Sequence, residues 1–423
     1  MNTEQRGAGR KTLALLFCLL LSGTWSPARG ASSTNLGLHV DGKGVLTRNG
    51  VPYRGIGVNY YDAFLRTLRN PNDDSYVSGF AKLGAHGIPF ARMAAGAYLG
   101  KDFQLYLTDK DAYFRKLDAV VQAAEKSNVG LIASLFWTIA AVSDVVHEPR
   151  ERWGDPKSQT RQFMRKYTQE VVSRYAKSPA IWGWEFSCEL SLPVDQPPGK
   201  AYAERTLSLE TFQSAALDFA RVVRKIDPGR ILLTGNSLPR VSAYHAATGG
   251  GFAADTEDQF GHVLLRDNPG PFSPICIHAS PAGIERFFAD RRVSYQGLLE
   301  ACMRIGRSAG KPVYLEEFVP IPGRPGARRG MSEKDYFSSE LAAIKGSGIP
   351  IASVWVYDRK LVPDRSNLTF ENERAYMLQM IADANRALHA ENKSPAKFTG
   401  PGLTLPQDRG PSVALICGQI DSR

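Results

Sequence analysis

The stretch that decides the fold is an apolar and aromatic run that ends in an acid, Ala180-Ile181-Trp182-Gly183-Trp184-Glu185-Phe186-Ser187-Cys188-Glu189. Apolar residues occupy both the odd and the even positions of this run, which is typical of a β-strand buried on both faces. Glu189 then lies where the strand would emerge at its C-terminal end. A second run, Lys311-Pro312-Val313-Tyr314-Leu315-Glu316-Glu317-Phe318, ends in the same way. Two carboxylates at the ends of two parallel strands could face each other across one site.

Strand-like and helix-like patterns alternate on both sides of these runs. Eight strands are predicted at 53–61, 88–93, 131–137, 180–189, 231–235, 274–278, 311–318 and 351–357. Amphipathic helices are predicted at 75–83, 109–126, 160–175, 211–226, 294–309, 333–345 and 372–389. The segment before the sixth strand is predicted to be a Gly-rich, aromatic loop. Successive β-then-α units predict an α/β fold, the (β/α)8 or TIM barrel. A doubly wound sheet would also alternate, but the glycine fingerprint that usually follows its first strand is missing here.

The two ends of the chain differ from this alternating region. Basic residues precede the apolar run 13–21, and small residues follow it, so residues 1–30 are predicted to be a signal peptide. The protein is therefore expected to be secreted or periplasmic, with no membrane span after signal removal. Asn49-Gly50 between apolar runs predicts a short N-terminal β-hairpin that would cover the floor of the barrel. The barrel is predicted over 36–390, and residues 391–423 are predicted to be a Pro/Gly-rich tail.

Charge and cysteine content narrow the classes of partner. The 423-residue chain has a formal net charge of +10, of which residues 1–30 contribute +3 and the remainder +7. This charge could favour acidic glycans, but a scattered, solvated surface is the more ordinary interpretation. The four cysteines outside the signal and the seven histidines show no metal-ligand spacing. Neither a metal nor another cofactor is expected, nucleic acid is not expected as a partner, and a monomer is expected.

Each predicted strand carries a polar or aromatic residue at its C-terminal end. In a (β/α)8 barrel the active site lies at that face. Aromatic rings there can stack on sugar rings, while acids and amides bind hydroxyl groups. These strand-end residues are Asn59, Arg92, Trp137, Glu189, Asn236, His278, Glu317 and Trp355, and they are predicted to form the site.

With these residues the sequence resembles glycoside hydrolase family 5, the cellulase and mannanase group of retaining barrel hydrolases. The resemblance covers roughly residues 36–389. The family's fourth strand often reads Gly-Trp-Glu-x-x-Asn-Glu, and 183–189 matches it except at Cys188. Its seventh strand reads Lys-Pro-x-x-x-x-Glu-Phe, which is matched in 311–318. Arg92 and Trp355 match the second-strand arginine and the eighth-strand tryptophan.

The resemblance implies a role for each carboxylate. Glu189 would be the general acid/base and Glu317 the nucleophile, with the two carboxyl groups about 5–5.5 Å apart. Arg92 would pair with Glu317 and stabilise its charge. Glu316 has the opposite strand parity to Glu317, so only one of the two is expected to point into the site. Glu185, four residues before Glu189, is expected to be a hydrogen-bonded structural acid one layer deeper.

Two departures from the family pattern leave the function open. Cys188 replaces an asparagine whose amide would bond the sugar 2-hydroxyl, and a thiol is a weaker donor. The family's His-x-Tyr on strand six is here His278-Ala279-Ser280, without the tyrosine that supports the nucleophile. The favoured hypothesis is a secreted β-glycoside hydrolase that cleaves a β-mannan or β-glucan type of polysaccharide. The alternative is a non-catalytic, carbohydrate-binding barrel, and a metal-dependent barrel is the least favoured.

Overall fold

Eight parallel strands form one sheet in a computed structural model that describes residues 36–194, 207–281, 284, 287–321 and 330–393. The predicted signal peptide and all but the first three residues of the predicted tail lie outside these ranges. The strands are β4 (Gly55–Asn59), β5 (Phe90–Ala94), β6 (Gly130–Phe136), β7 (Ile181–Ser187), β8 (Ile231–Leu233), β9 (Ile275–His278), β10 (Val313–Phe318) and β11 (Ile351–Val354).

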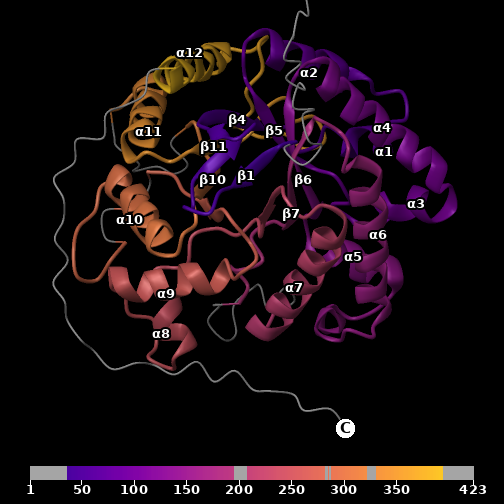
Figure 1. Cartoon of the computed structure of the whole chain (residues 1–423), viewed down its shortest axis with the longest axis horizontal. Helices are drawn as coiled ribbons and strands as arrows, with labels where there is room; N and C mark the ends of the chain where they lie inside the picture. Colours follow the sequence, from indigo (N-terminus) through magenta and orange to yellow (C-terminus); the bar gives the residue numbers. More distant parts are fainter. Residues whose placement is uncertain (1–35, 195–206, 282–283, 285–286, 322–329, 394–423) are drawn as a thin grey trace, which may run out of the picture.

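The order of the strands is that of a (β/α)8 barrel. Hydrogen-bonded neighbours follow the sequence from β4 to β8 in one direction, and β11, β10 and β9 follow β4 in the other. Helices surround the strands as an outer ring (Figure 1). The predicted fold is therefore confirmed. The main helices are α2 (Ser75–Ala85), α4 (Lys110–Lys126), α6 (Gln159–Tyr175), α7 (Leu209–Ile226), α9 (Glu257–Asp267), α10 (Tyr295–Ser308), α11 (Glu333–Ser347) and α12 (Ala375–Lys393).

The predicted hairpin covers the barrel floor. It is part of a three-stranded antiparallel sheet of β1 (Leu38–Val40), β2 (Leu46–Arg48) and β3 (Val51–Pro52). Asn49 and Gly50 form its turn with φ angles of 54° and 77°, a left-handed conformation that these two residue types tolerate best. Leu38 and Leu46 pack against the first residues of the barrel strands, Trp182 among them. This closes the N-terminal end, so a site can form only at the opposite end.

The segment before the sixth strand is not the loop that the sequence predicts. It holds α8 (Ala243–Ala247) and α9, and α9 provides the helix of the fifth β/α unit. The start of α9 has a capping box, in which the Thr256 hydroxyl accepts from the Gln259 backbone and the Gln259 side chain accepts from the Thr256 backbone. This Thr-x-x-Gln signal was readable in the sequence. Short helices that the sequence did not reveal are α1 (Leu65–Arg69), α3 (Gln104–Thr108), α5 (Ile139–Val146) and two single 3₁₀ turns, Gly100–Phe103 and Arg150–Gly154.

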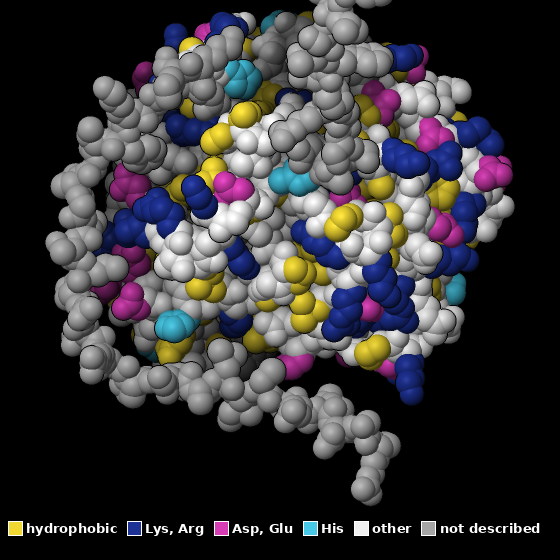
Figure 2. All heavy atoms as spheres, in the orientation of Figure 1, with side chains coloured by type: hydrophobic (Ala, Val, Ile, Leu, Met, Phe, Trp, Pro, Cys, Tyr) yellow, Lys and Arg dark blue, Asp and Glu magenta, His cyan; other side chains and the backbone are white. Residues whose placement is uncertain are grey.

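Basic side chains gather in one area at the lower right of the face shown in Figure 2, and elsewhere on this face basic and acidic side chains are interspersed. Within the described ranges, no helix combines the length and the apolar character that a bilayer span requires.

The barrel closes through side chains at the seam between β8 and β9. Among the described residues no ladder joins β8 to β9, and Leu232 of β8 instead forms an isolated antiparallel bridge with Ser273, which precedes β9. The fully buried Asn268 fills the gap: its Oδ1 accepts from the Thr234 hydroxyl at 2.8 Å and from the Cys276 backbone N–H at 2.9 Å. These buried donors have no access to water and need a partner within the protein. The Asn268 amide provides it and replaces hydrogen bonds that a strand ladder would otherwise make.

We predict that Asn268→Ala lowers the free energy of unfolding by about 2–4 kcal/mol, since it leaves two buried donors unpaired. Urea unfolding followed by tryptophan fluorescence measures the change. The exposed Asn70→Ala is the control and should change stability by less than about 0.5 kcal/mol. Equal midpoints for Asn268→Ala and Asn70→Ala would contradict a closing role for the seam asparagine.

Candidate active site

A buried arginine occupies the centre of the C-terminal end of the barrel. Arg92 is 0% exposed and binds Glu185 through two hydrogen bonds of 2.8 and 2.9 Å. Its Nη1 lies 2.7 Å from Oε1 of Glu317 and 3.1 Å from Oδ1 of Asn59. Arg92 therefore connects three strands and holds the Glu317 carboxylate in place. The predicted structural role of Glu185 and the pairing of Arg92 with Glu317 both agree with this geometry.

Glu189 is held at the mouth by its backbone. It follows β7 with a φ of 56°, an uncommon angle for a non-glycine residue, and its N–H donates to the Gly235 carbonyl at 2.7 Å. Two residues on, the Ser191 N–H donates to Oδ1 of Asn236 at 3.1 Å. The Glu189 side chain is 43% exposed, so it can reach a molecule in the mouth.

One histidine contacts three carboxylates. Nδ1 of His278 lies 2.9 Å from Oε1 of Glu189 and 3.6 Å from Oε2 of Glu317. Its Nε2 lies 3.4 Å from Oε2 of Glu316. Oε1 of Glu189 and Oε2 of Glu317 both lie near Nδ1 of His278. These two oxygens are therefore at most about 6.5 Å apart, which is the sum of their distances to Nδ1. This limit lies at the lower end of the range of about 6.5–9.5 Å that inverting glycosidases use and includes the spacing of about 5–5.5 Å of retaining enzymes.

The prediction that Glu316 and Glu317 point to different sides is wrong. The register of β10 shifts between Leu315 and Glu317 relative to β9, which marks a bulge at Glu316. A bulge breaks the strict alternation of side chains on which the prediction depended. Asn59 holds the bulge, because its Nδ2 donates to the Glu316 carbonyl at 2.8 Å. Both carboxylates therefore contact His278, with Glu316 fully buried below Glu317.

The three carboxylates and Arg92 set the charge state of the site. Burial alone would lower the pKa of His278, but the charges of Glu317 and Glu189 and hydrogen bonds with Glu189 and Glu316 raise it to about 10. Burial alone would raise the pKa of Glu189, but the hydrogen bond and charge of His278, together with Arg92, hold it below its usual value. In the free protein Glu189 is therefore a carboxylate paired with an imidazolium.

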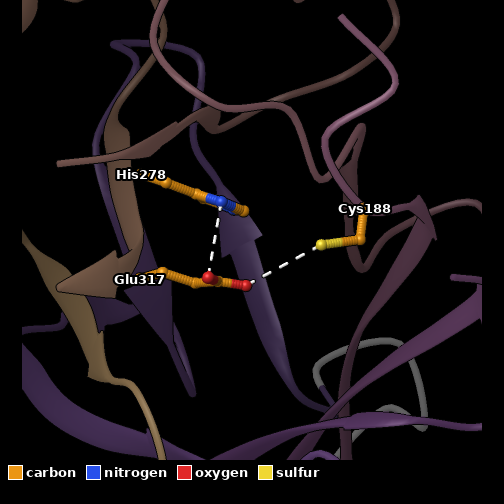
Figure 3. A group of neighbouring side chains, drawn as sticks. All are labelled: Cys188, His278 and Glu317. Carbon is orange, nitrogen blue, oxygen red and sulfur yellow. Dashed lines mark hydrogen bonds and ion pairs between the residues drawn. The ribbon is translucent and has the colours of Figure 1, made fainter. Parts of the chain in front are cut away.

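Cys188 lies opposite His278 across Glu317 (Figure 3). Its Sγ is 3.7 Å from Oε1 of Glu317, so the thiol donates a weak hydrogen bond to that carboxylate. Burial raises the pKa of the Cys188 thiol, which keeps it protonated. Glu317 thus has Arg92, His278 and Cys188 as neighbours, and Ser280, at the position of the missing tyrosine, instead accepts from the Val319 N–H at 2.9 Å.

Two tryptophans form an aromatic wall at the mouth. The ring centroids of Trp137 and Trp355 are 6.3 Å apart, and Tyr61 packs against both. Arg92 lies over the Trp137 ring at 4.4 Å. Trp355 is only partly buried, and its Nε1 donates to Asp364 at 3.1 Å. The predicted aromatic residues are therefore at the site and partly available for stacking on a sugar.

The side-chain amides of Asn59 and Asn236, which were predicted to bind substrate, form hydrogen bonds within the protein. Asn59 and Asn236 are 0% exposed. Asn236 donates to the Asp267 carbonyl at 2.7 Å and accepts from the Ser191 N–H, so both ends of its amide are used. Asn59 likewise bonds Arg92 and the bulge. Both asparagines, which the sequence predicts to bind substrate, therefore position neighbouring loops and charges in this structure and do not present their amides to the solvent. Arg92, equally buried, positions Glu317 and does not face the solvent.

A cavity of about 660 Å³ adjoins Glu189, whereas Glu317 does not line it. Trp137, Cys188 and Glu189 lie along its wall, and Tyr98 and Arg240 line it further out. Ser237 also hydrogen-bonds Glu189. Tyr98, Ser237 and Arg240 were missed in the sequence, whereas Glu316 was set aside because of its strand parity. Of the three missed residues, only Ser237, beside the predicted Asn236, had a signal that could have found it.

Solved structures share this fold over most of the chain. The endo-1,4-beta-mannanase from Rhizomucor miehei matches with a TM-score of 0.60 and 15% identity, covering 84% of this chain and 99% of that one. A GH5_18 protein from Streptomyces cattleya, in complex with GlcNAc, matches with 0.60 and 16%, covering 82% of each chain. The beta-glucanase SdGluc5_26A from Saccharophagus degradans matches with 0.54 and 14%, covering 85% of this chain and 95% of that one.

These matches define the class of fold. The chain has the (β/α)8 architecture of this mannanase and this beta-glucanase, and of a glycoside hydrolase family 5 mannosidase from Rhizomucor miehei. No protein-family model and no curated protein matches the sequence.

The His278 environment makes stability depend on pH. Its pKa is raised from 6.5 to about 10, so above pH 6.5 the folded state keeps a proton that the unfolded state releases. The stabilisation is fully present below about pH 6.5 and is lost as the pH rises through about 10. As the pH rises from about 6.5 to about 10, we expect the urea midpoint of the wild type to decrease relative to the midpoint of His278→Gln.

Nuclear magnetic resonance tests the same prediction directly. One imidazole signal should titrate near pH 10 and be absent from His278→Gln. If every histidine signal titrates near 6.5, the proposed charge state of the site is incorrect.

Proposed function

We propose that this protein is a retaining β-glycoside hydrolase that acts on a β-mannan or β-glucan type of polysaccharide. The observation that carries the proposal is the single atom Nδ1 of His278, which lies 2.9 Å from Glu189 and 3.6 Å from Glu317. Two carboxylates this close, at the open end of a barrel, suit a double displacement through a covalent intermediate.

Glu317 is the nucleophile in this proposal. Arg92 and Cys188 contact its Oε1, which leaves Oε2 beside the space between the two acids. Oε2 attacks the anomeric carbon as the bond to the leaving-group oxygen breaks, and a glycosyl ester forms. Water then cleaves this ester, which returns the carboxylate and a sugar with its original anomeric configuration.

Glu189 transfers the proton in both steps, and His278 is its hydrogen-bonded partner. A leaving alkoxide needs a proton, and the pair of Glu189 and His278 holds one on Nδ1. In the first step the Nδ1 proton moves onto Glu189 as Glu189 delivers a proton to the leaving oxygen, which leaves a Glu189 carboxylate and a neutral His278. In the second step this carboxylate accepts a proton from the attacking water, and its transfer to Nδ1 restores the imidazolium.

The substrate class follows from the surroundings of the acids. The aromatic wall of Trp137 and Trp355 offers faces for sugar rings. The cavity beside Glu189 is large enough for at least one further sugar unit. The solved structures with this fold include mannanases and a glucanase. The N-terminal sequence supports a secreted or periplasmic protein, which is where a polysaccharide would be met.

One observation favours the second candidate, a carbohydrate-binding barrel without catalysis. The Glu189 pKa is lowered, whereas a general acid works best when its pKa is raised towards the working pH. Together with Cys188 in place of an amide, this describes a site that retains sugar-binding surfaces but has a weaker acid.

We predict that the wild type hydrolyses mannan or β-glucan with retention, and that Glu317→Gln and Glu189→Gln each lower kcat by about 10²–10⁴-fold. Dye-linked mannan, glucan and xylan identify the substrate, and nuclear magnetic resonance reads the first anomer released. Glu373→Gln, an exposed glutamate on the loop before α12, is the control and should keep full activity.

Azide separates the two roles. With added azide, Glu317→Ala should form an α-glycosyl azide by direct displacement, and Glu189→Ala should form a β-glycosyl azide from the covalent intermediate. Calorimetric binding of oligosaccharides without any turnover would favour the binding barrel. Release of the inverted anomer would exclude the retaining mechanism.

We also predict that Cys188→Asn raises kcat more than it changes KM. An amide at this position would donate to the sugar 2-hydroxyl, a bond that strengthens in the transition state. A regained hydrogen bond of about 1.5–3 kcal/mol corresponds to roughly ten- to a hundred-fold in rate. Steady-state kinetics on the best substrate give the result. An unchanged or lower kcat in a folded variant means that Cys188 has another use.

A further inference from the structure

Three donor atoms of different chemistry converge at the barrel mouth. The thiol of Cys188, the imidazole of His278 and the carboxylate of Glu317 each offer one ligand atom, and these atoms lie within 4.8 Å of one another. Figure 3 shows the three side chains pointing towards one space, from three different strand ends. Among the described residues, this is the group of three or more such side chains close enough to hold a metal ion.

The spacing suits a tetrahedral ion. Zinc bonds of about 2.0–2.3 Å to sulfur, nitrogen and oxygen place neighbouring ligand atoms about 3.3–3.6 Å apart in a tetrahedron. Cys188 Sγ lies 3.7 Å from Oε1 of Glu317, and His278 Nδ1 lies 3.6 Å from its Oε2. The three ligand atoms together span up to 4.8 Å, so the side chains must approach by about 1 Å to bring all three to bonding distance of one ion.

The charge of the site permits a divalent ion despite Arg92. Ligation of a divalent ion requires a thiolate sulfur and an imidazole nitrogen without a proton, so the ion displaces the protons that these atoms carry. Four glutamate carboxyls, those of residues 185, 189, 316 and 317, also surround the two cationic side chains.

We propose that Cys188, His278 and Glu317 form a binding site for a thiophilic divalent cation of the zinc type, which blocks the active site reversibly. A set of sulfur, nitrogen and oxygen ligands selects such an ion over Mg²⁺ or Ca²⁺, which prefer oxygen. The ion would occupy Glu317 and the proton-carrying nitrogen of His278. Its inhibitory effect rests on the proposed hydrolase function, but its binding does not.

This proposal departs from the expectation of no metal, which used spacing along the sequence. Residues 188, 278 and 317 are far apart in the chain, and only the closed barrel brings them together. It also gives Cys188, the residue that departs from the family pattern, a chemical use.

Cobalt(II) provides the test, because thiolate ligation of this ion gives a near-ultraviolet charge-transfer band and tetrahedral geometry gives intense visible bands. The full chain is titrated with Co²⁺ near pH 8, and Zn²⁺ is then added as a competitor. We expect one Co²⁺ per chain with both signatures, and loss of both when Zn²⁺ is added. In Cys188→Ser the charge-transfer band should disappear and the affinity should fall by about tenfold or more.

Cys302→Ser is the matched control, since Cys302 is a fully buried thiol on α10, outside the site. It should keep the bands and the affinity of the wild type. Circular dichroism confirms that both variants are folded. His278→Gln is a second variant, which should weaken Co²⁺ binding without removing a thiol. The same charge-transfer band in Cys188→Ser, or none in the wild type, overturns the proposal.

Activity measurements separate this proposal from the proposed function. If the hydrolase is active, Zn²⁺ should inhibit the wild type and a chelator should restore it, whereas Cys188→Ser should need about tenfold more Zn²⁺. If no glycan is cleaved, the Co²⁺ titration still decides the metal site. An active enzyme without the Co²⁺ bands would support the hydrolase and refute the metal site.

Discussion

The active site depends on one buried ion pair, that between Arg92 and Glu185. A guanidinium with no solvent contact is stable only if its charge and its N–H groups are matched, and Glu185 supplies a carboxylate at 2.8 and 2.9 Å. The remaining Nη1 is then directed at Glu317 and Asn59. Arg92 lies on β5, Glu185 on β7 and Glu317 on β10. The ion pair between Arg92 and Glu185 therefore couples these strands to the position of Glu317, the proposed nucleophile. Asn59 extends the network, since it also holds the bulge at Glu316.

The site above this ion pair is crowded with negative charge, and His278 is the group that responds. Glu189, Glu316 and Glu317 all contact its ring, so the imidazole holds a proton that it would lose in water near neutral pH. The proton makes the close approach of two carboxylates tolerable. It also lowers the pKa of Glu189, so the same contact that brings the two acids together weakens one of them as an acid.

Cys188 distinguishes this site from the family pattern, which has an asparagine at this position. It contacts the carboxylate that would act as the nucleophile, and it replaces an amide with a soft, weakly donating sulfur. This change favours ligation of a thiophilic ion and reduces hydrogen bonding to a sugar. The two consequences have one physical cause, which is that sulfur is larger, more polarizable and a poorer hydrogen-bond donor than an amide nitrogen.

The sequence by itself determined the eight strands, the floor hairpin and the two acids, because burial on both faces and turn chemistry are local signals. Runs such as 180–189 and 311–318 show them directly, and Asn49-Gly50 shows the turn. Helix α9 was also readable, from its capping box. Only the tertiary structure decided which strand-end residues face the solvent. Asn59 and Asn236 are buried and used by the backbone, a bulge turns Glu316 towards His278, and barrel closure brings Cys188, His278 and Glu317 together. These outcomes depend on strand register and on contacts between distant residues, which no local pattern encodes.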